Sequence, residues 1–164
     1  FLSIPTVYQI QKFITRSSYI QTEQGNKYLY DSPTYRSIFK YYSLSNVLSL
    51  YGIPEQAYVL IDNGIADMGL GIDLYFLYIV YPEQGWMVSY KMELREKDGF
   101  FIGCPQEAFV GIYIKLPGAE AKKAFHPGGT PLQKATSLTL EEFYTQFRDA
   151  APNTCLKARI DSIP

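Results

Sequence analysis

The amino-acid sequence predicts an α+β fold, with an antiparallel meander sheet of about four to five strands packed with two or three short helices. Two observations carry this prediction. Apolar residues recur at helical spacing (i, i+3, i+4 and i+7) in two separate segments, 43–51 and 139–148. Between these segments, short apolar or alternating runs are separated by turn residues, which is typical of antiparallel strands.

The N-terminal segment 1–42 is rich in tyrosine and has the weakest pattern. Residues 1–18 fit a first helix, because Pro5 stands where a helix start tolerates proline and the apolar residues after it share one face. Residues 26–30 fit a short extended piece, and residues 35–42 fit either a strand or a helix.

The clearest helix signal begins at Ser43, a residue type that caps helix N-termini. Gly52 stops this helix and Pro54 prevents its return. Its apolar stripe consists of Leu44, Val47, Leu48 and Tyr51. Because a helix this short is marginal by itself, we expect it to dock on the sheet.

Strand-like runs then follow one another, joined by turn sequences. The second run is apolar on both faces and is expected to be central, whereas the third alternates with a period of two. Asp98-Gly99 is a hairpin signal, and a meander is the natural topology for such an order. The predicted strands are 57–61, 71–81, 86–95, 100–103 and 109–116.

The last third of the chain is predicted to contain a loop, a helix and a tail. Residues 117–134 are rich in Gly, Pro and Lys and are expected to form the loop. Thr139 with Glu142 forms a capping-box pattern at the start of the helix. We expect residues 149–164 to be an irregular tail. The chain is predicted to be a single domain, 1–164, with a helix-sheet-helix core at 43–148.

The two cysteines, Cys104 and Cys155, are far apart and flanked by turn residues. A metal site needs closer spacing or more ligands, so a disulfide between them is the preferred reading and two free buried thiols are the alternative. The bridge would close a loop of roughly 50 residues and stabilise the fold by about 3–4 kcal/mol. It also indicates an oxidising compartment.

Composition excludes several function classes. The formal net charge is −1, without the basic surplus of a nucleic-acid-binding protein, so no nucleic-acid partner is expected. The longest apolar run, residues 70–81, is shorter than the ~18 residues of a membrane helix, so no transmembrane segment is expected. The chain begins at Phe1 rather than Met, which indicates processing of a precursor with a signal peptide or lipid anchor.

No catalytic set is recognisable, and we predict a protein that is not an enzyme and binds no cofactor or metal. The only histidine, His126, lies in a Gly- and Pro-rich segment and is expected to be an exposed loop residue. Gly128-Gly129-Thr130 lacks the features of a phosphate loop. Carboxylates could form a hard-cation or hydrolytic site, but their spacing favours a solvated turn. The carboxylates of this turn are Asp62, Asp67 and Asp73, and Glu142, which caps the predicted helix, joins them only in the hydrolytic alternative.

The chain has 15 tyrosines and ten phenylalanines. Most are expected to fill the sheet, but such a surplus also suits a partner surface. Asp73 stands out as an acidic residue in an otherwise apolar strand run. We therefore predict a partner surface that includes Trp86, Tyr90 and Asp73.

The run Tyr51-Gly52-Ile53-Pro54-Glu55 resembles the helix-ending L-G-x-P-[DE] signature of small outer-membrane assembly lipoproteins of the SmpA/OmlA type. That family places helices before a three-stranded antiparallel sheet, and residues 86–90 lie where such a strand would be. Residues 43–164 also resemble uncharacterised secreted or lipid-anchored α+β proteins of filamentous green bacteria. Those proteins have a YG-x-P turn, a YPE-x-G turn like residues 81–85, and a late L-x-E-F helix.

The resemblance implies an extracytoplasmic domain that binds proteins or envelope components, and it carries no catalytic residues. The leading hypothesis is a non-enzymatic protein-interaction domain, such as an accessory subunit of an envelope or membrane-bound complex. Its predicted location is secreted, periplasmic or cell-surface, with a lipid anchor on a preceding segment as one form. The alternatives are a carbohydrate or small-molecule binding module with exposed aromatics, and a hydrolase using carboxylates.

Overall fold

The computed structural model describes residues 20–22, 25–27, 42–62, 73–83, 86–114, 128–151 and 153–164. The chain divides into two compact units, residues 1–41 and 42–164. In the first, β1 (Ile20–Thr22) and β2 (Gly25–Lys27) form an antiparallel pair. The predicted helix at 1–18 lies outside the described residues, as does the ambiguous segment as far as residue 41. The single-domain prediction stays a prediction.

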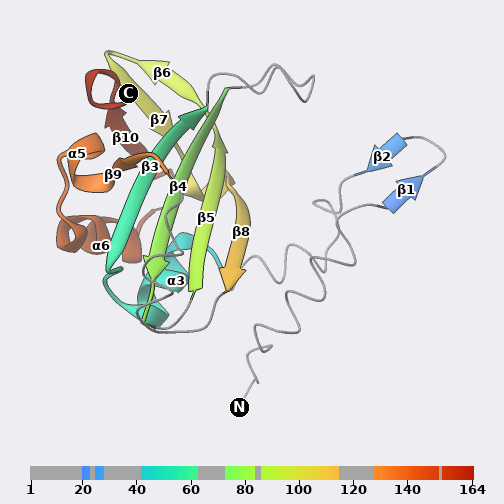
Figure 1. Ribbon diagram of the computed structural model, residues 1–164, viewed down its shortest axis with the longest axis horizontal. Coiled ribbons are helices and arrows are strands. Elements are labelled where there is room, and N and C mark those ends of the chain that lie inside the picture. The colour runs from blue at the N-terminus through green and yellow to red at the C-terminus, as the bar shows by residue number, and fades with distance from the viewer. Residues whose placement is uncertain are drawn as a thin grey trace. The chain divides into compact units, whose positions relative to one another are not determined.

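Two antiparallel sheets form the framework of the second unit (Figure 1). Strand order is β8-β5-β4-β3-β9 in the larger sheet and β10-β7-β6 in the smaller. The larger sheet contains β3 (Gln56–Asp62), β4 (Leu74–Tyr81), β5 (Trp86–Glu93), β8 (Phe109–Ile114) and β9 (Thr130–Pro131). The smaller contains β6 (Arg95–Lys97), β7 (Phe100–Gly103) and β10 (Leu156–Arg159). The predicted α+β class is confirmed.

A meander runs through β3, β4 and β5, and β4 lies in the middle of the larger sheet as its apolar sequence indicated. The chain then leaves this sheet. Asp98 and Gly99 both have positive φ, 53° and 81°, and join β6 to β7 in a two-residue turn. Residues 100–103 were expected to continue the larger sheet. They instead belong to the smaller one, because β7 pairs with β10, and the chain returns as β8 beside β5.

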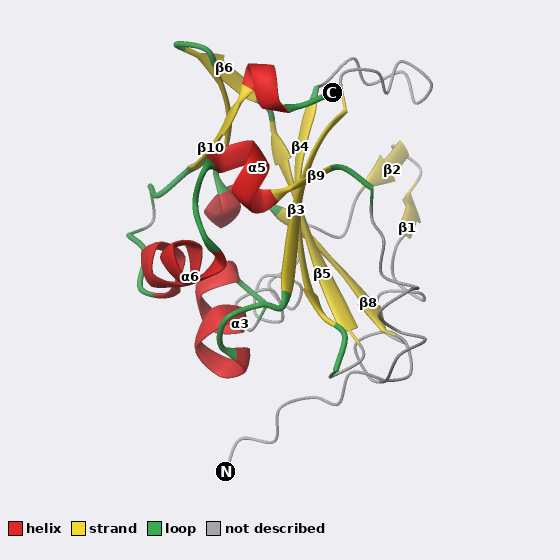
Figure 2. Cartoon of the chain, turned by 60° about the vertical axis from the view of Figure 1, so that its left-hand side comes forward, coloured by secondary structure: helices red, strands yellow, loops and turns green. Residues whose placement is uncertain are grey.

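The helices lie on one side of the larger sheet (Figure 2). They are α3 (Leu44–Tyr51), α5 (Leu132–Thr136) and α6 (Leu140–Arg148), together with single 3-10 turns η3 (Pro105–Glu107) and η4 (Ile160–Ser162). The capping box of α6 is confirmed, since Glu142 N donates to Thr139 Oγ1 (3.1 Å) and Thr139 N donates to Glu142 Oε2 (2.8 Å). Ser43 holds the N-cap position of α3, but its side chain makes no capping hydrogen bond.

The core lies between the helices and the larger sheet. Two buried tyrosines link the layers: Tyr90 Oη donates to the carbonyl of Tyr42, ahead of α3, and Tyr81 Oη donates to that of Gly52, behind it. Burial raises the pKa of both hydroxyls, so they stay protonated as donors across the physiological range. The largest fully buried side chains also include Tyr75, Phe143, Phe147, Leu44, Leu48, Leu77, Ile79, Met92 and Leu132.

The smaller sheet packs against the larger one where β7 meets β4. The absence of a side chain at Gly103 permits this approach, because a Cβ there would lie 2.7 Å from Cγ of Tyr75. The Tyr75 hydroxyl is buried and makes no hydrogen bond within the described part of the chain.

Two predictions for the C-terminal third are wrong. Residues 130–134, expected in a loop, form β9 and the first three residues of α5, which buries Leu132 and Ala135 and packs against β3 and β10. The tail, expected to be irregular, forms β10 from Leu156 to Arg159. Its side chains alternate between buried and exposed, and β7 supplies the hydrogen-bonding partner that a four-residue strand requires.

Candidate functional site

The three residues predicted as a partner surface do not come together in the structure. Tyr90 is completely buried, so it belongs to the core and the prediction for this residue is wrong. Asp73 is exposed beside the start of β4, where its carbonyl accepts a hydrogen bond from Leu94 N (3.1 Å). The side chain of Trp86 lies outside the described part of the chain.

A different surface has the composition of a contact site. Leu50, Tyr51 and Ile53 follow one another at the end of α3, and their side chains are 59%, 39% and 44% exposed. We call this surface the apolar tip. Large apolar residues grouped on a surface mark interaction sites, whereas single exposed ones need no explanation. Three within four positions therefore make the apolar tip the strongest candidate among the described residues.

The backbone beneath the apolar tip is held by the core. Gly52 takes a φ of 80°, which ends the helix, and its N–H donates to the carbonyl of Leu48 (2.9 Å). The Gly52 carbonyl accepts the hydrogen bond from Tyr81, whose ring centroid lies 5.7 Å from that of Tyr51. A buried anchor thus holds the turn that presents the exposed residues. Such pre-organisation lowers the entropy lost when a partner binds.

Acidic residues flank the apolar tip. The backbone N–H of Glu83, in the β4–β5 turn, donates to Oε1 of Glu55 (3.3 Å), so the two exposed acidic residues lie close together. The sequence adds to this bias, since it has no Lys or Arg between Lys40 and Lys91 but five acidic residues there. The apolar tip therefore lies in a segment, residues 41–90, whose charged residues are all acidic.

The side of the larger sheet opposite Tyr81 and Tyr90 carries a second group of aromatics. Phe76 and Tyr78 on β4 stack, with ring centroids 5.9 Å apart and an interplanar angle of 5°. The ammonium of Lys91 lies 5.8 Å from the Phe76 centroid, within the range of a cation–π contact. Tyr58 on β3 lies opposite Tyr78 in the register. These four side chains, the aromatic face, are half-buried.

The predicted carboxylates do not form one site. Glu142 caps α6, and Asp62 ends β3 far along the chain from that helix. No group of three or more metal-ligating side chains gathers among the residues that the structure describes. His126 and Asp67 lie outside those residues.

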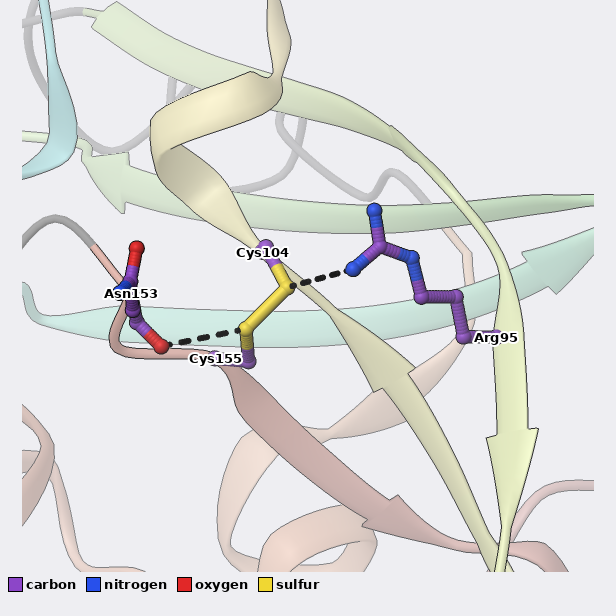
Figure 3. Close-up of a disulfide and its surroundings, with 4 residues drawn as sticks. All are labelled: Arg95, Cys104, Asn153 and Cys155. Carbon is purple, nitrogen blue, oxygen red and sulfur yellow. Dashed lines mark hydrogen bonds between the residues drawn. A yellow bond between two sulfur atoms is a disulfide. The ribbon is translucent and has the colours of Figure 1, made fainter.

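The disulfide between Cys104 and Cys155 is present and connects the ends of β7 and β10 (Figure 3). Gly103 and Leu156 form the last residue pair between β7 and β10. Cys104 follows Gly103 and Cys155 precedes Leu156, so the two cysteines lie next to this pair. Arg95 Nη1 lies 4.0 Å from Cys104 Sγ, and the Asn153 carbonyl lies 3.5 Å from Cys155 Sγ. The bridge fastens β10 to β7 within the smaller sheet.

Sequence reasoning missed the apolar tip, although one signal for it is present. Leu50 falls off the apolar stripe of α3, so an amphipathic helix would leave it facing water. Tyr51 belongs to the stripe but is the last residue of the helix, where the buried face ends. Leu50 and Ile53 are apolar residues outside the stripe, and they are the sequence signal that indicates this surface.

Comparisons with known proteins found no matching family model, no matching curated protein and no matching solved structure. In the part of the chain that the structure describes, no helix has the length and apolar character needed to cross a membrane. The candidate site therefore rests on its own geometry.

Proposed function

We propose that this chain is an extracytoplasmic, non-enzymatic protein-interaction domain that contacts its partner through the apolar tip. The exposure of Leu50, Tyr51 and Ile53 on a turn anchored by Tyr81 is the observation that carries the proposal. The disulfide supports an oxidising location, since such bridges persist outside the cytosol. Together with the resemblance of residues 43–164 to envelope proteins, this favours a secreted, periplasmic or cell-surface accessory subunit.

Charge complementarity defines the partner more closely. A protein with an apolar pocket and a basic rim fits the apolar tip and its acidic flank at Glu55 and Glu83. A membrane surface fits it less well, because anionic headgroups repel carboxylates and favour Lys and Arg instead. The site therefore favours a protein surface over a lipid surface.

Replacing both Leu50 and Ile53 by Asp tests this proposal. Both side chains are exposed, so we expect a loss of stability of only about 1 kcal/mol, which comes from placing acidic groups at the C-terminal end of α3. Affinity for the partner should fall by about tenfold or more, because apolar anchors at the centre of an interface contribute ~1–2 kcal/mol or more each. The partner is first identified by native mass spectrometry of an envelope extract and then purified for titration by calorimetry.

Phe100→Ser is the matched control, because Phe100 is also exposed and apolar but lies on β7 rather than at the apolar tip. It should leave the affinity unchanged. Affinity should also weaken steeply with salt if the rim of the partner is basic. A partner that binds the Leu50/Ile53 double variant as tightly as the wild-type protein would show that the contact lies elsewhere.

A carbohydrate or small-molecule binding module is the second candidate, favoured by the stacked rings of Phe76 and Tyr78. Flat aromatic surfaces with a few polar groups are common in small-ligand sites. We expect saturable binding of one member of a glycan panel in titration calorimetry, and loss of that binding in Phe76→Ala. Tyr51→Ala is the control at the apolar tip. A flat titration across the panel would remove this candidate.

A further inference from the structure

The smaller sheet has one face that packs on the larger sheet and one that points away from it. On β7, Gly103 faces Tyr75 of β4, since a Cβ there would lie 2.7 Å from the tyrosine ring. Leu156, the partner of Gly103 on β10, is buried. Because successive side chains of a strand point to opposite faces, Phe100 and Ile102 of β7 lie on the outward face.

The outward face carries a row of apolar residues between two rows of basic ones. The apolar row consists of Phe100, which is 36% exposed, and Ile102, which is half-buried. Each of them is paired with a basic residue of β6 on one side and a basic residue of β10 on the other. We call this surface the basic face, and its exposed basic residues are Arg95, Lys97, Lys157 and Arg159.

The uniform sign of these charges is not required for solubility. Acidic and basic side chains both blunt an exposed strand edge, and the chain has 16 acidic and 15 basic residues. All four edge positions of the outward face are nevertheless basic, while Glu96 of β6 alternates to the other face. A surface with one charge sign around an exposed aromatic ring is suited to an anionic partner.

Acidic residues border the basic face without replacing its charge. Asp161 accepts hydrogen bonds from Arg159 (3.0 and 2.6 Å), and Asp98 lies in the exposed turn that follows Lys97. Lys97 and Lys157 make no hydrogen bond or ion pair with the residues that the structure describes. These two ammonium groups therefore remain available to an anionic ligand, one on each edge of the smaller sheet.

We infer that the basic face docks on a membrane surface that carries anionic lipid headgroups. Lys and Arg side chains close to such a surface are attracted to the headgroups, and Phe enters the boundary between headgroups and acyl chains. Two basic edges with Phe100 between them match both parts of this environment. A single anion at the centre of the face would meet Phe100 and Ile102 rather than hydrogen-bond donors, so an isolated phosphate fits less well.

The spacing of the basic residues also fits a surface with repeated charges. Their backbones are ~10 Å apart across the sheet, two strand spacings, and ~7 Å apart along each strand. An extended layer of headgroups can meet all four side chains at once, without a defined arrangement of anions. Such contacts act locally, because salt limits them to about 8–10 Å, so the net charge of −1 for the whole chain does not prevent docking.

The position of the apolar tip favours a membrane over an acidic protein as the occupant. The smaller sheet and α3 lie at opposite ends of the larger sheet (Figures 1 and 2). Anionic headgroups attract the basic face and repel Glu55 and Glu83 at the other end, so docking leaves the apolar tip clear of the bilayer. The docking itself does not depend on what the apolar tip binds.

Co-sedimentation of the full chain with lipid vesicles tests this inference. We expect binding to vesicles of equal parts phosphatidylcholine and phosphatidylglycerol, no binding to pure phosphatidylcholine, and release as sodium chloride is raised. The Lys97→Gln/Lys157→Gln double variant should reduce the partition coefficient roughly 25-fold, about fivefold for each charge removed. Both lysines are exposed, so the variant should fold as the wild type does.

The matched control is the Lys134→Gln/Arg148→Gln double variant. It removes the same charge from exposed positions on α5 and α6, and it should bind nearly as well as the wild type. Phe100→Ser should weaken vesicle binding severalfold through the loss of its apolar ring. The Leu50/Ile53 double Asp variant should still bind vesicles, which separates this result from the test of the apolar tip.

Four outcomes would overturn the inference. Equal binding to neutral and anionic vesicles would show apolar adsorption without a role for the basic residues. Equal losses in the two double variants would assign binding to net charge instead of this face. Displacement by inorganic phosphate, at an ionic strength matched with sodium chloride, would indicate a site for a single anion. Saturable binding of poly-glutamate without vesicle binding would assign the basic face to an acidic protein.

Discussion

Replacing Cys104 and Cys155 together by alanine is expected to lower the free energy of unfolding by about 3–4 kcal/mol. The bridge joins residues 51 positions apart, so it removes many conformations from the unfolded chain. In the native state it also fastens β10, whose four residues would otherwise depend on one short ladder to β7. Urea unfolding followed by circular dichroism measures the change. A loss of stability lowers the urea concentration at the midpoint of unfolding, and a change in the slope of free energy against urea shows that the denatured state has also changed.

Reduction of the wild-type protein provides the control for this experiment. Dithiothreitol should destabilise the wild-type chain by about as much as the double substitution and should leave the double variant unchanged. Agreement between the two would assign the effect to the bond rather than to the replaced side chains. A double variant that unfolds within ~1 kcal/mol of the oxidised wild type would contradict the chain-entropy explanation.

Phe143→Ala is expected to be among the most damaging single substitutions in the described core, with a cost of about 3–5 kcal/mol. Phe143 is fully buried on α6, and its ring centroid lies 5.0 Å from that of Phe147. Truncation to alanine removes apolar burial and leaves a cavity beside α3, against which α6 packs. Chemical unfolding of the purified variant measures the loss.

Gln146→Ala serves as the matched control on the same helix. Gln146 is exposed, so its truncation should change stability by no more than ~0.5 kcal/mol. The difference between the two variants then reports the burial of Phe143 and not the helix propensity of alanine. Similar, small effects at both positions would mean that α6 contributes little to the core.

The local elements were predictable because their signals lie close together in the chain. The helix that ends at Gly52 needs an apolar stripe and a residue that tolerates positive φ. The stripe and the glycine both lie within ten residues of sequence. The capping box at Thr139 and Glu142 and the turn at Asp98-Gly99 are equally local. Their dihedral angles and hydrogen bonds are set by residues within a few positions of each other, so sequence alone indicates them.

The candidate site was less predictable, and Tyr90 shows why. Its place on an alternating strand defines which side chains share its face but not whether that face meets water. In the folded chain Tyr90 is fully buried, and its hydroxyl donates to the carbonyl of Tyr42, ahead of α3. Leu50 and Ile53 show the opposite outcome, because their exposure depends on where the helix layer ends.

The sequence by itself determined the helix at 44–51, the capped helix at 140–148 and the central position of β4. Tertiary structure alone decided which strands share a sheet. Residues 100–103 pair with β10, over 50 positions away, and the disulfide joins the two strands at one end of this ladder. Pairing energy depends on the partner strand, and a partner so distant in the chain leaves no trace in local periodicity.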